Sequence, residues 1–313
     1  MADVTCLGIL VNDVVALPVD RYPEPGELMR LPRIEMHIGG CAANTGIDLQ
    51  KIGIDTAVIG KVGNDGFGDF LIKAMAETGV DCAGVSRDND CCTSVSMVMV
   101  RSDGERSFIH TVGANAHIDP DRDIDFDIIR KSKILHVAGS FLMPGFDGEP
   151  TAKVLAKAKE MGITTCLDTA GSPTPEWKDM LAPCYPYLDM VVPSYDEATV
   201  MTDKTDPKAI AEDFMNKGIK TVAIKMGSKG SYVCNGSEEY TLPIYKVKAI
   251  DANGCGDSFA AGFIAGVVNG WDLEMCGKFA NAVGAFCVQG VGTTAGIKDQ
   301  ATILKFMEEY DAQ

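Results

Sequence analysis

The stretch that decides the fold is Asp251-Ala252-Asn253-Gly254-Cys255-Gly256-Asp257, which places two acids and two glycines within seven positions. The almost wholly apolar segment Ser258–Val268 follows it and has the length of a buried helix. A tight glycine turn that opens a helix presents free backbone N–H groups, and such a turn binds anions without a basic side chain. Asp257 would lie at its mouth, where a carboxylate can accept a proton from a substrate hydroxyl. The alternative is a polar turn in which the Asp caps the helix.

The composition describes a globular chain and argues against several kinds of partner. Of the 313 residues, 46% are hydrophobic and 23% are charged, which fits one large domain or one domain with a small appendage. The net charge of −16 argues against nucleic acid or an anionic membrane as a partner. The sequence shows no apolar run of 18 residues and no basic leader, so we expect neither a membrane span nor a signal peptide. The 11 cysteines include no C-x-x-C pair, which favours reduced thiols and a cytoplasmic location.

Short β-branched runs alternate with helical patterns along most of the chain. The predicted strands are Val4–Val11, Thr56–Val62, Ile134–Ala138, Thr164–Asp168, Met190–Val192 and Thr221–Lys225. The predicted helices are Ala42–Ile52, Phe67–Glu77, Thr151–Met161, Tyr195–Met201, Pro207–Lys217, Ser258–Val268 and Leu273–Val288. Such alternation is typical of βαβ units, so we predict a mostly parallel sheet with helices on both faces.

Two regions interrupt this alternation and predict a small second sheet. The first, Val14–Ile38, is rich in proline and polar turns and lacks a helical period. The second, Thr93–His117, has two β-rich runs around the turn Ser102–Glu105, which is the pattern of a hairpin. We predict that they join as a discontinuous β lid, from about 14–38 and 93–117, beside the main domain. Its exposed strands would allow a homodimer through the lid.

Two glycine-rich segments precede predicted helices. In Gly39-Gly40-Cys41-Ala-Ala-Asn44 the glycines let a ligand approach the backbone, and Asn44 offers both a donor and an acceptor to a hydroxyl. The segment Gly60–Gly68 lacks the spacing of a phosphate-binding P-loop, so a turn that keeps the backbone near a substrate is favoured. The alternative for both segments is an ordinary structural turn.

Four further segments have both a structural and a functional interpretation. Asn12-Asp13 ends the first predicted strand, where ligands bind in parallel sheets, although it could be a solvated strand end. Ser194–Glu197 has the spacing of a capping box, and Glu197 could also hold the water shell of Mg²⁺. Lys225–Gly230 is either a hairpin turn or a backbone that lies along a nucleotide. Cys287–Gly296 contains a glycine-rich helix end whose carbonyls could coordinate a cation.

The order of these motifs resembles the ribokinase-like family of carbohydrate kinases, often called the PfkB family. The matching motifs are Asn12-Asp13, Gly39-Gly40-x-x-x-Asn44, Gly60-x-Val-Gly-x-Asp-x-Phe-Gly68 and Asp251-x-x-Gly-x-Gly-Asp257, and together they span nearly the whole chain. The resemblance implies one kinase domain over 1–313, with a Rossmann-type three-layer α/β/α core and a β lid. It also implies transfer of the γ-phosphoryl group of ATP to a substrate hydroxyl.

The resemblance implies a role for each motif residue. It makes Asp257 the general base and gives the anion hole to Gly254, Cys255 and Gly256. The implied acceptor contacts are Asp13, Gly39, Gly40, Cys41, Asn44, Phe141 and Asp257. The implied ATP contacts are Ser194, Lys225, Gly227, Ser228, Gly230, Gly256 and Asn281. Glu197 would hold Mg²⁺ through water, and a monovalent cation such as K⁺ would lie among Asp251, Asn253, Cys287, Gly290, Gly292 and Gly296.

Several departures from the family pattern leave the acceptor open. Ser194 stands where the family usually has Asn, Ala252 where Thr is common, and Cys41 where ribokinases carry a lysine. The segment Ala138–Met143 lacks the glutamate that ribokinases place near the sugar, and Phe141 could stack on a ring instead. A sugar kinase is therefore the first expectation, and a nucleoside kinase or a catalytically silent sugar sensor are alternatives. The absence of G-x-G-x-x-G after the first strand disfavours a dehydrogenase.

Overall fold

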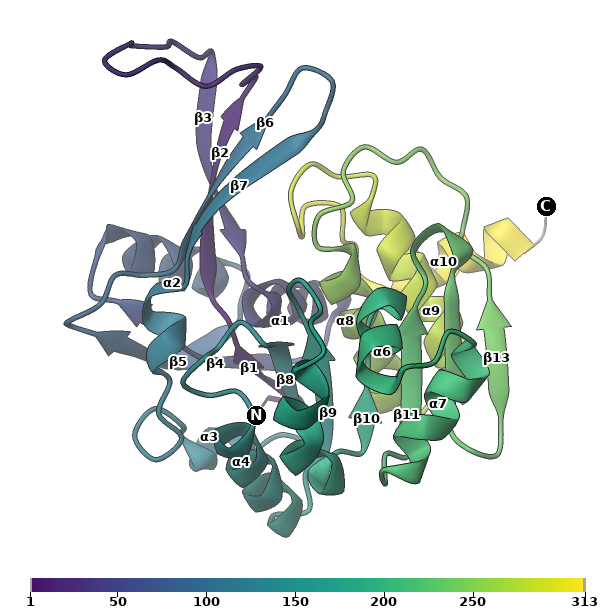
Figure 1. The fold of residues 1–313 in the computed structure, drawn as a ribbon. Coiled ribbons are helices and arrows are strands. Elements are labelled where there is room, and N and C mark those ends of the chain that lie inside the picture. The colour runs from purple at the N-terminus through teal and green to yellow at the C-terminus, as the bar shows by residue number, and fades with distance from the viewer. Residues whose placement is uncertain (1, 312–313) are drawn as a thin grey trace.

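The computed structural model describes residues 2–311, and within them the chain forms a nine-stranded main sheet and a four-stranded lid sheet (Figure 1). The strand order of the main sheet is β13-β12-β11-β10-β9-β8-β1-β4-β5. All neighbours are parallel except β12, which is antiparallel to both β11 and β13. The bounds are β1 Val4–Gly8, β4 Thr56–Gly63, β5 Asp81–Asp88, β8 Ile134–Ser140, β9 Thr164–Thr169, β10 Met190–Val191, β11 Thr221–Lys225, β12 Ser231–Cys234 and β13 Glu239–Leu242.

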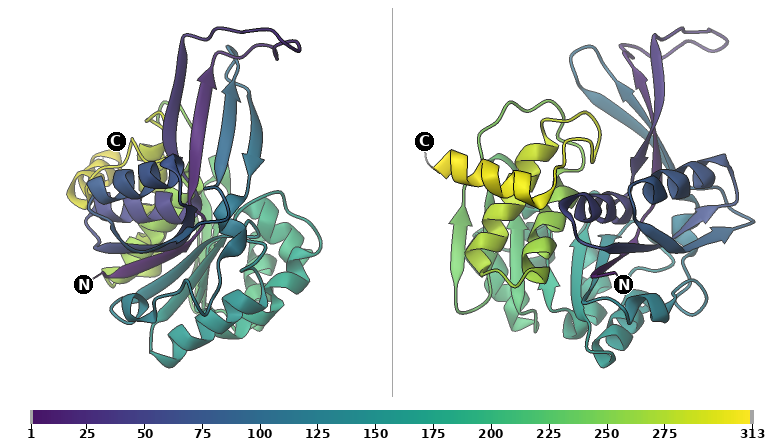
Figure 2. Two further views of the ribbon diagram at one scale, coloured as in Figure 1. Left: turned by 90° about the vertical axis from the view of Figure 1, so that its left-hand side faces the viewer. Right: turned by 180° about the vertical axis from the view of Figure 1, so that it is seen from behind.

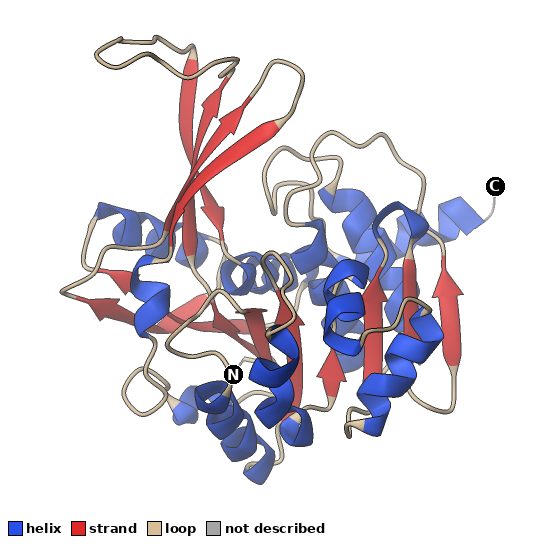
Figure 3. Cartoon of the chain, viewed as in Figure 1, coloured by secondary structure: helices blue, strands red, loops and turns tan. Residues whose placement is uncertain are grey.

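Helices cover both faces of this sheet, as Figure 3 shows. One face packs on α1 Cys41–Ile52, α2 Gly66–Glu77, α8 Cys255–Val268, α9 Leu273–Cys287 and α10 Gln300–Asp311. The other face packs on α3 Phe126–Ile129, α4 Glu149–Glu160, α5 Trp177–Leu181, α6 Tyr195–Thr202 and α7 Pro207–Asn216. The 3₁₀ turns are η1 Gly113–His117, η2 Ala182–Tyr187 and η3 Gly227–Lys229. The central strands are buried on both sides, because Cys6 lies in one core and Leu7 in the other.

The lid sheet consists of β2 Val11–Leu17, β3 Arg33–Gly39, β6 Val95–Val100 and β7 Arg106–Thr111, in the order β3-β2-β6-β7. It projects from the carboxyl edge of the main sheet, as both views of Figure 2 show. Strands β2 and β3 form one hairpin, β6 and β7 form another, and β2 pairs with β6 in parallel. The predicted small β lid and the predicted α/β core are therefore confirmed, and the lid has four strands.

The first predicted strand is wrong in its extent. The run Val4–Val11 is two strands, because β1 ends at Gly8 and the lid strand β2 begins at Val11. A side chain at Gly8 would collide with the carbonyl group of Ala138, so the break in the strand depends on a glycine. Asp13 consequently lies within the lid and not at the end of a core strand.

Other predicted elements are present with bounds shifted by at most three residues. The sequence did not predict β5, because this edge strand is polar and mostly half-exposed. It also did not predict β13 or α10. The apolar run Ser231–Cys234 proves to be β12, so the Lys225–Gly230 segment joins two antiparallel strands. Among the described residues no helix is both long and apolar enough to cross a membrane.

Candidate active site

The centre of the site is a hydrogen bond between two helix N-termini. Asn44 lies in the first turn of α1 and Asp257 in the first turn of α8. The Nδ2 atom of Asn44 donates to Oδ2 of Asp257 at 2.7 Å. On its other side, Oδ1 of Asn44 lies 2.8 Å from Oγ1 of Thr293. Asn44 is therefore held at both ends of its amide group and fixes the orientation of the Asp257 carboxylate.

Burial raises the pKa of the Asp257 carboxyl above its usual value. The hydrogen bond from Asn44, the ammonium group of Lys225 and the thiol of Cys41 each oppose that rise, while Glu197 adds to it. A carboxylate with a raised pKa is a stronger base than an exposed aspartate. The carboxyl is thus suited to accept a proton while it remains anchored by Asn44.

The turn before α8 has the geometry expected of a backbone anion site. Gly254 has φ of 76°, and a side chain there would collide with the carbonyl group of Thr293, so the position requires glycine. The intrahelical ladder begins where N of Ser258 donates to O of Gly254 at 2.8 Å. The amide groups of Gly256 and Asp257 precede that bond, so they lie among the helix-start donors that have no intrahelical acceptor.

A lysine ammonium lies beside this anion site. An ideal Cβ on Gly256 would be 3.4 Å from Nζ of Lys225. The same Nζ donates to both oxygens of Asp168, each at 2.7 Å, and both side chains are largely buried. Burial raises the pKa of the Asp168 carboxyl, and the Lys225 ammonium opposes that rise. Lys225 ends β11 and Asp168 lies near the end of β9, so the carboxyl edge of the sheet brings them together.

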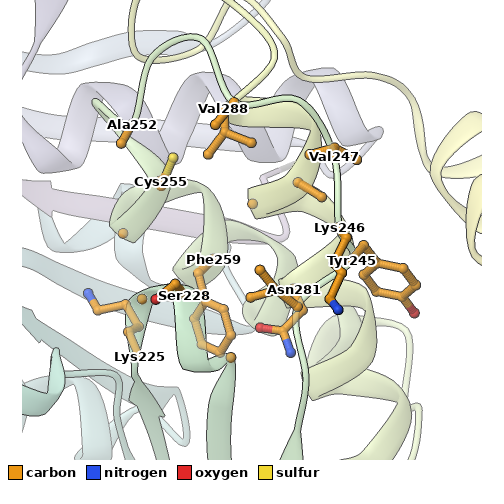
Figure 4. Close-up of a pocket in the computed structure, with 17 residues that line it drawn as sticks. Lys225, Ser228, Tyr245, Lys246, Val247, Ala252, Cys255, Phe259, Asn281 and Val288 are labelled. Atoms are coloured by element: carbon orange, nitrogen blue, oxygen red, sulfur yellow. The ribbon is translucent and has the colours of Figure 1, made fainter. Parts of the chain in front are cut away.

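A cavity of about 420 Å³ opens next to the anion site (Figure 4). Its volume is within the range of small-molecule and cofactor sites. The predicted ATP residues that line it are Lys225, Gly227, Ser228, Gly230, Gly256 and Asn281. Apolar walls come from Tyr245, Val247, Phe259 and Val288, which suit the flat face of a base. The Nδ2 atom of Asn281 donates to O of Leu242 at 3.3 Å and to O of Pro243 at 3.1 Å, so Asn281 also shapes this wall.

Ser194 and Glu197 form the capping box that their spacing predicts. Ser194 N donates to Oε2 of Glu197 at 2.8 Å, and N of Glu197 donates to Oγ of Ser194 at 3.4 Å. Ser194 also lines a second cavity that shares Lys225 with the first. Glu197 is buried and acts electrostatically on both Lys225 and Asp257. The carboxylates around Lys225 give this end of the cavity the negative charge that suits Mg²⁺.

Polar groups of the lid face Asp257 from the other side. Asp13 pairs in register with His37 on β3 and with Ser96 on β6, and Ser96 pairs with His110 on β7. Burial raises the pKa of the Asp13 carboxyl to about 6, against the opposing effects of Ser96 and His37. This row of polar side chains can bind hydroxyl groups.

The two glycines before α1 leave room for the groups around them. An ideal Cβ on Gly39 would lie 2.5 Å from Oδ2 of Asp13, so the absence of a side chain admits that carboxylate. A side chain at Gly40 would likewise collide with the backbone of Ile9 and Val11. Cys41, which follows, has its thiol next to Asp257. The predicted acceptor residues of these segments are thus brought together beside Asp257.

Phe141 lies at the end of β8 in an uncommon conformation. Its φ is 78°, and its N donates to Oδ1 of Asp147 at 2.8 Å. Its ring stacks on Trp177 with centroids 3.8 Å apart and an interplanar angle of 18°. One ring face is therefore occupied by Trp177, and a ligand could stack only on the other.

Several of the expected monovalent-cation residues already have partners within the chain. The Asp251 carboxylate accepts from N of Asn253 at 2.9 Å, from N of Gly292 at 3.0 Å and from Nη2 of Arg106 at 2.9 Å. The thiol of Cys287 is a hydrogen-bond donor here, to O of Asn253 at 3.3 Å and to O of Thr293. A side chain at Gly290 would collide with Gly296, and one at Gly296 with O of Phe286, so these two glycines close the loop. The chain itself thus supplies donors to the Asp251 carboxylate, and a cation at this loop stays a prediction.

Sequence reasoning missed three residues of the site. Asp168 ends a predicted strand, and the rule that ligand groups lie at the carboxyl end of parallel strands could have found it. Thr293 and Arg106 carry no comparable signal, because their contacts with Asn44 and Asp251 come from elements distant in the sequence.

This combination of a doubly covered parallel sheet, a glycine anion site with a buried carboxylate, and a β lid defines a phosphotransferase of the ribokinase fold. The family model for the pfkB family carbohydrate kinases matches residues 1–300. The chain belongs to the pfkB family of carbohydrate kinases. The expected class, an ATP-dependent carbohydrate kinase, is confirmed.

Known relatives agree with this assignment. An uncharacterized sugar kinase of Archaeoglobus fulgidus is 30% identical over 250 residues, which cover 80% of this chain and 97% of that protein. The structure of Arabidopsis thaliana ribokinase with ribose and ATP is 26% identical, with a TM-score of 0.87 and coverage of 98% and 99%. An E. coli structure with ATP and Mg²⁺ is 25% identical, with a TM-score of 0.84 and coverage of 99% and 100%. Relatives of similar identity include a ribokinase and a 6-phosphofructokinase, so similarity does not select the acceptor.

Proposed function

We propose that this protein transfers the γ-phosphoryl group of ATP to a hydroxyl group of a free sugar of the ribose or fructose class. The observation that carries the proposal is the position of Asp257, which is anchored by Asn44 at 2.7 Å and lies in the first turn of α8. A single residue there can contact both the acceptor hydroxyl and the phosphoryl group that is transferred.

The nucleotide would lie in the cavity between Lys225–Gly230 and the start of α8. The amide groups of Gly256 and Asp257 would donate to the γ-phosphoryl oxygens, and Lys225 would add a positive charge beside them. Bound Mg²⁺, held through water by Glu197, would neutralise phosphate charge. Asp257 would take the proton of the attacking hydroxyl. The γ-phosphoryl group would pass from the nucleotide on one side of the Gly256–Asp257 turn to the acceptor on the other side.

The polar row on the lid supports a sugar as the acceptor. Asp13 and Ser96, with His37 and His110 beside them, offer several hydrogen-bonding groups to adjacent hydroxyls. Closure of the lid over the acceptor would exclude water and limit hydrolysis of ATP. The stacked Phe141–Trp177 pair is the observation that favours the second candidate, a nucleoside kinase, because a base could stack on the other face of the Phe141 ring.

We also propose that the lid forms a homodimer. An apolar row crosses the four strands of the lid on the face opposite the polar row. It consists of Met36, Val14, Met97 and Ile109, which are in register. Met36, Met97 and Ile109 have 45%, 50% and 56% of their surface exposed. A contiguous apolar row on an exposed sheet marks a protein interface.

The test is a coupled assay of ADP formation with a panel of free sugars, sugar phosphates and nucleosides, with product identified by mass spectrometry. We expect a free pentose or hexose to give the highest kcat/KM. Preference for a nucleoside would favour the second candidate, a nucleoside kinase, over a sugar kinase. Binding of a sugar without phosphorylated product for any acceptor would show a catalytically silent sugar sensor and would overturn the proposal.

A further inference from the structure

Arg106 connects the lid to the loop that carries the anion site. It is the first residue of β7, near the free end of the lid, and Figure 1 shows that this hairpin rises on the same side as the loops that flank α8 and α9. Its Nη2 donates to Oδ1 of Asp251 at 2.9 Å, and its Nη1 donates to Oδ1 of Asn253. The side chain of Arg106 is 26% exposed and that of Asp251 is 9% exposed, so the pair is shielded from water.

The loop needs a positive charge at this point. The Asp251 carboxylate accepts hydrogen bonds from the N–H groups of Asn253 and Gly292 and forms an ion pair with the guanidinium of Arg106. This carboxylate lies only a few residues before the amide groups of Gly254–Gly256. Without a counter-charge, a carboxylate so close to the anion site would repel the phosphates of ATP.

A guanidinium pairs with the side-chain oxygens of this loop in a way that a spherical ion does not. Its planar fork donates in two directions at once, to the carboxylate of Asp251 and to the side-chain oxygen of Asn253. It is always charged at the pH values of cells. An ion among the same oxygens would lie against the guanidinium, so Arg106 and a cation exclude one another.

We propose that Arg106 is a positioning residue that takes the place of a monovalent cation at the Asp251–Asn253 loop, so that phosphoryl transfer by this protein does not depend on K⁺. Because Arg106 belongs to the lid, the loop receives its counter-charge from the lid that covers the acceptor. The anion site is then fully ordered only when the β6–β7 hairpin contacts the loop. This inference rests on the proposed kinase function.

The first experiment compares salts at equal ionic strength. Product formation by the wild-type protein should be the same in KCl, NaCl and tetramethylammonium chloride. Arg106→Ala should lower kcat by about a hundredfold in tetramethylammonium chloride, because the loop loses its position beside the phosphates. Addition of KCl should restore activity to that variant, since K⁺ can occupy the vacated position and tetramethylammonium is too large.

Two further variants separate positioning from folding. Arg106→Lys keeps the positive charge without the fork, and we expect it to retain more activity than Arg106→Ala in tetramethylammonium chloride. Arg101→Ala is the matched control, because Arg101 lies in the turn of the same hairpin and contacts Asp103 and Asp20 instead. This control should leave kcat and its independence of K⁺ unchanged. A fall in kcat of Arg106→Ala that KCl does not reverse would contradict the proposal.

A binding measurement tests the inference without activity. Tl⁺, a probe for K⁺ sites, is titrated into the wild-type protein and into Arg106→Ala, and binding is followed by thallium nuclear magnetic resonance. We expect binding only to the variant. Equal binding to both proteins, or stimulation of the wild type by K⁺ of several-fold, would overturn the proposal. If no acceptor is phosphorylated, the kinase proposal fails, and the Tl⁺ comparison still decides whether Arg106 occupies the cation position.

Discussion

Asn44 and Asp257 are separated by 213 residues in the sequence and are joined by a hydrogen bond of 2.7 Å. The bond connects the first turn of α1 to the first turn of α8, so the N-terminal and C-terminal parts of the chain meet at the proposed base. Thr293 extends this contact to the loop after α9 through Oδ1 of Asn44. The proposed base is thus positioned by three segments, and each of them can be tested separately.

Asp257→Asn should lose most turnover and keep ATP binding. The amide cannot accept a proton, and general-base catalysis contributes about 10²–10⁴-fold, so kcat should fall by a factor in that range. The amide groups of the turn remain, so the Kd for ATP, measured by calorimetry, should stay close to that of the wild type. Asp272→Asn is the control, because Asp272 caps α9 outside the site. A near-normal kcat for Asp257→Asn would refute the assignment of the base.

Asn44→Ala should move the pH profile of the reaction. The Asn44 donor lowers the pKa of the Asp257 carboxyl, in opposition to burial, so removal of the donor leaves the pKa higher. The carboxylate then protonates at a higher pH as the solution is acidified. The acidic limb of kcat/KM should therefore shift to higher pH, whereas Asn269→Ala, an exposed control on the end of α8, should show no shift. A profile that moves to lower pH would contradict this role of Asn44.

Lys225→Met should destabilise the protein through Asp168. Removal of the ammonium leaves a buried carboxyl without its partner, and such losses cost about 3–5 kcal/mol in the free energy of unfolding. The double variant Lys225→Met/Asp168→Asn removes the unpaired charge, so urea unfolding should show that part of the stability returns. Phosphoryl transfer should remain low in the double variant, because the positive charge beside Gly256 is absent. Restoration of both properties would show that Lys225 has only a structural role.

Met97→Glu should dissociate the proposed dimer. Met97 lies in the exposed apolar row of the lid, and a buried unpaired carboxylate there would oppose association. Phe108→Glu is the matched control, since Phe108 is 60% exposed, against 50% for Met97, and lies on the opposite face of the same sheet. Sedimentation should show a dimer for the wild type and Phe108→Glu and a monomer for Met97→Glu. A monomeric wild type would refute the dimer.

The sequence predicted the α/β core and the position of the anion site because these depend on local patterns. The glycine turn before Ser258 and the strand ending at Lys225 are each recognisable within a few residues. The position of Asp13 was predicted incorrectly, because β-forming residues continue from β1 into β2 and hide the break at Gly8. The edge strand β5 was missed because its polar residues face solvent.

Contacts between distant segments could not be predicted from one sequence. Asp168 and Lys225 end different strands, and only the strand order β9-β10-β11 places them close enough for an ion pair. The sequence places Arg106 in a predicted hairpin, and its contact with Asp251 depends on how the lid is oriented. The partner of Asp251 at the expected cation site was missed for this reason, since the donor comes from another part of the chain.

Both hairpins of the lid are inserted into connections of the core. The β2–β3 hairpin lies between β1 and α1, and the β6–β7 hairpin lies between β5 and η1, so no strand of the main sheet pairs with a strand of the lid. The core can therefore complete its strand pairing during folding before either hairpin has joined the other. Substitutions on the lid are then expected to change the proposed acceptor contacts and the proposed dimer with little effect on how the catalytic domain folds.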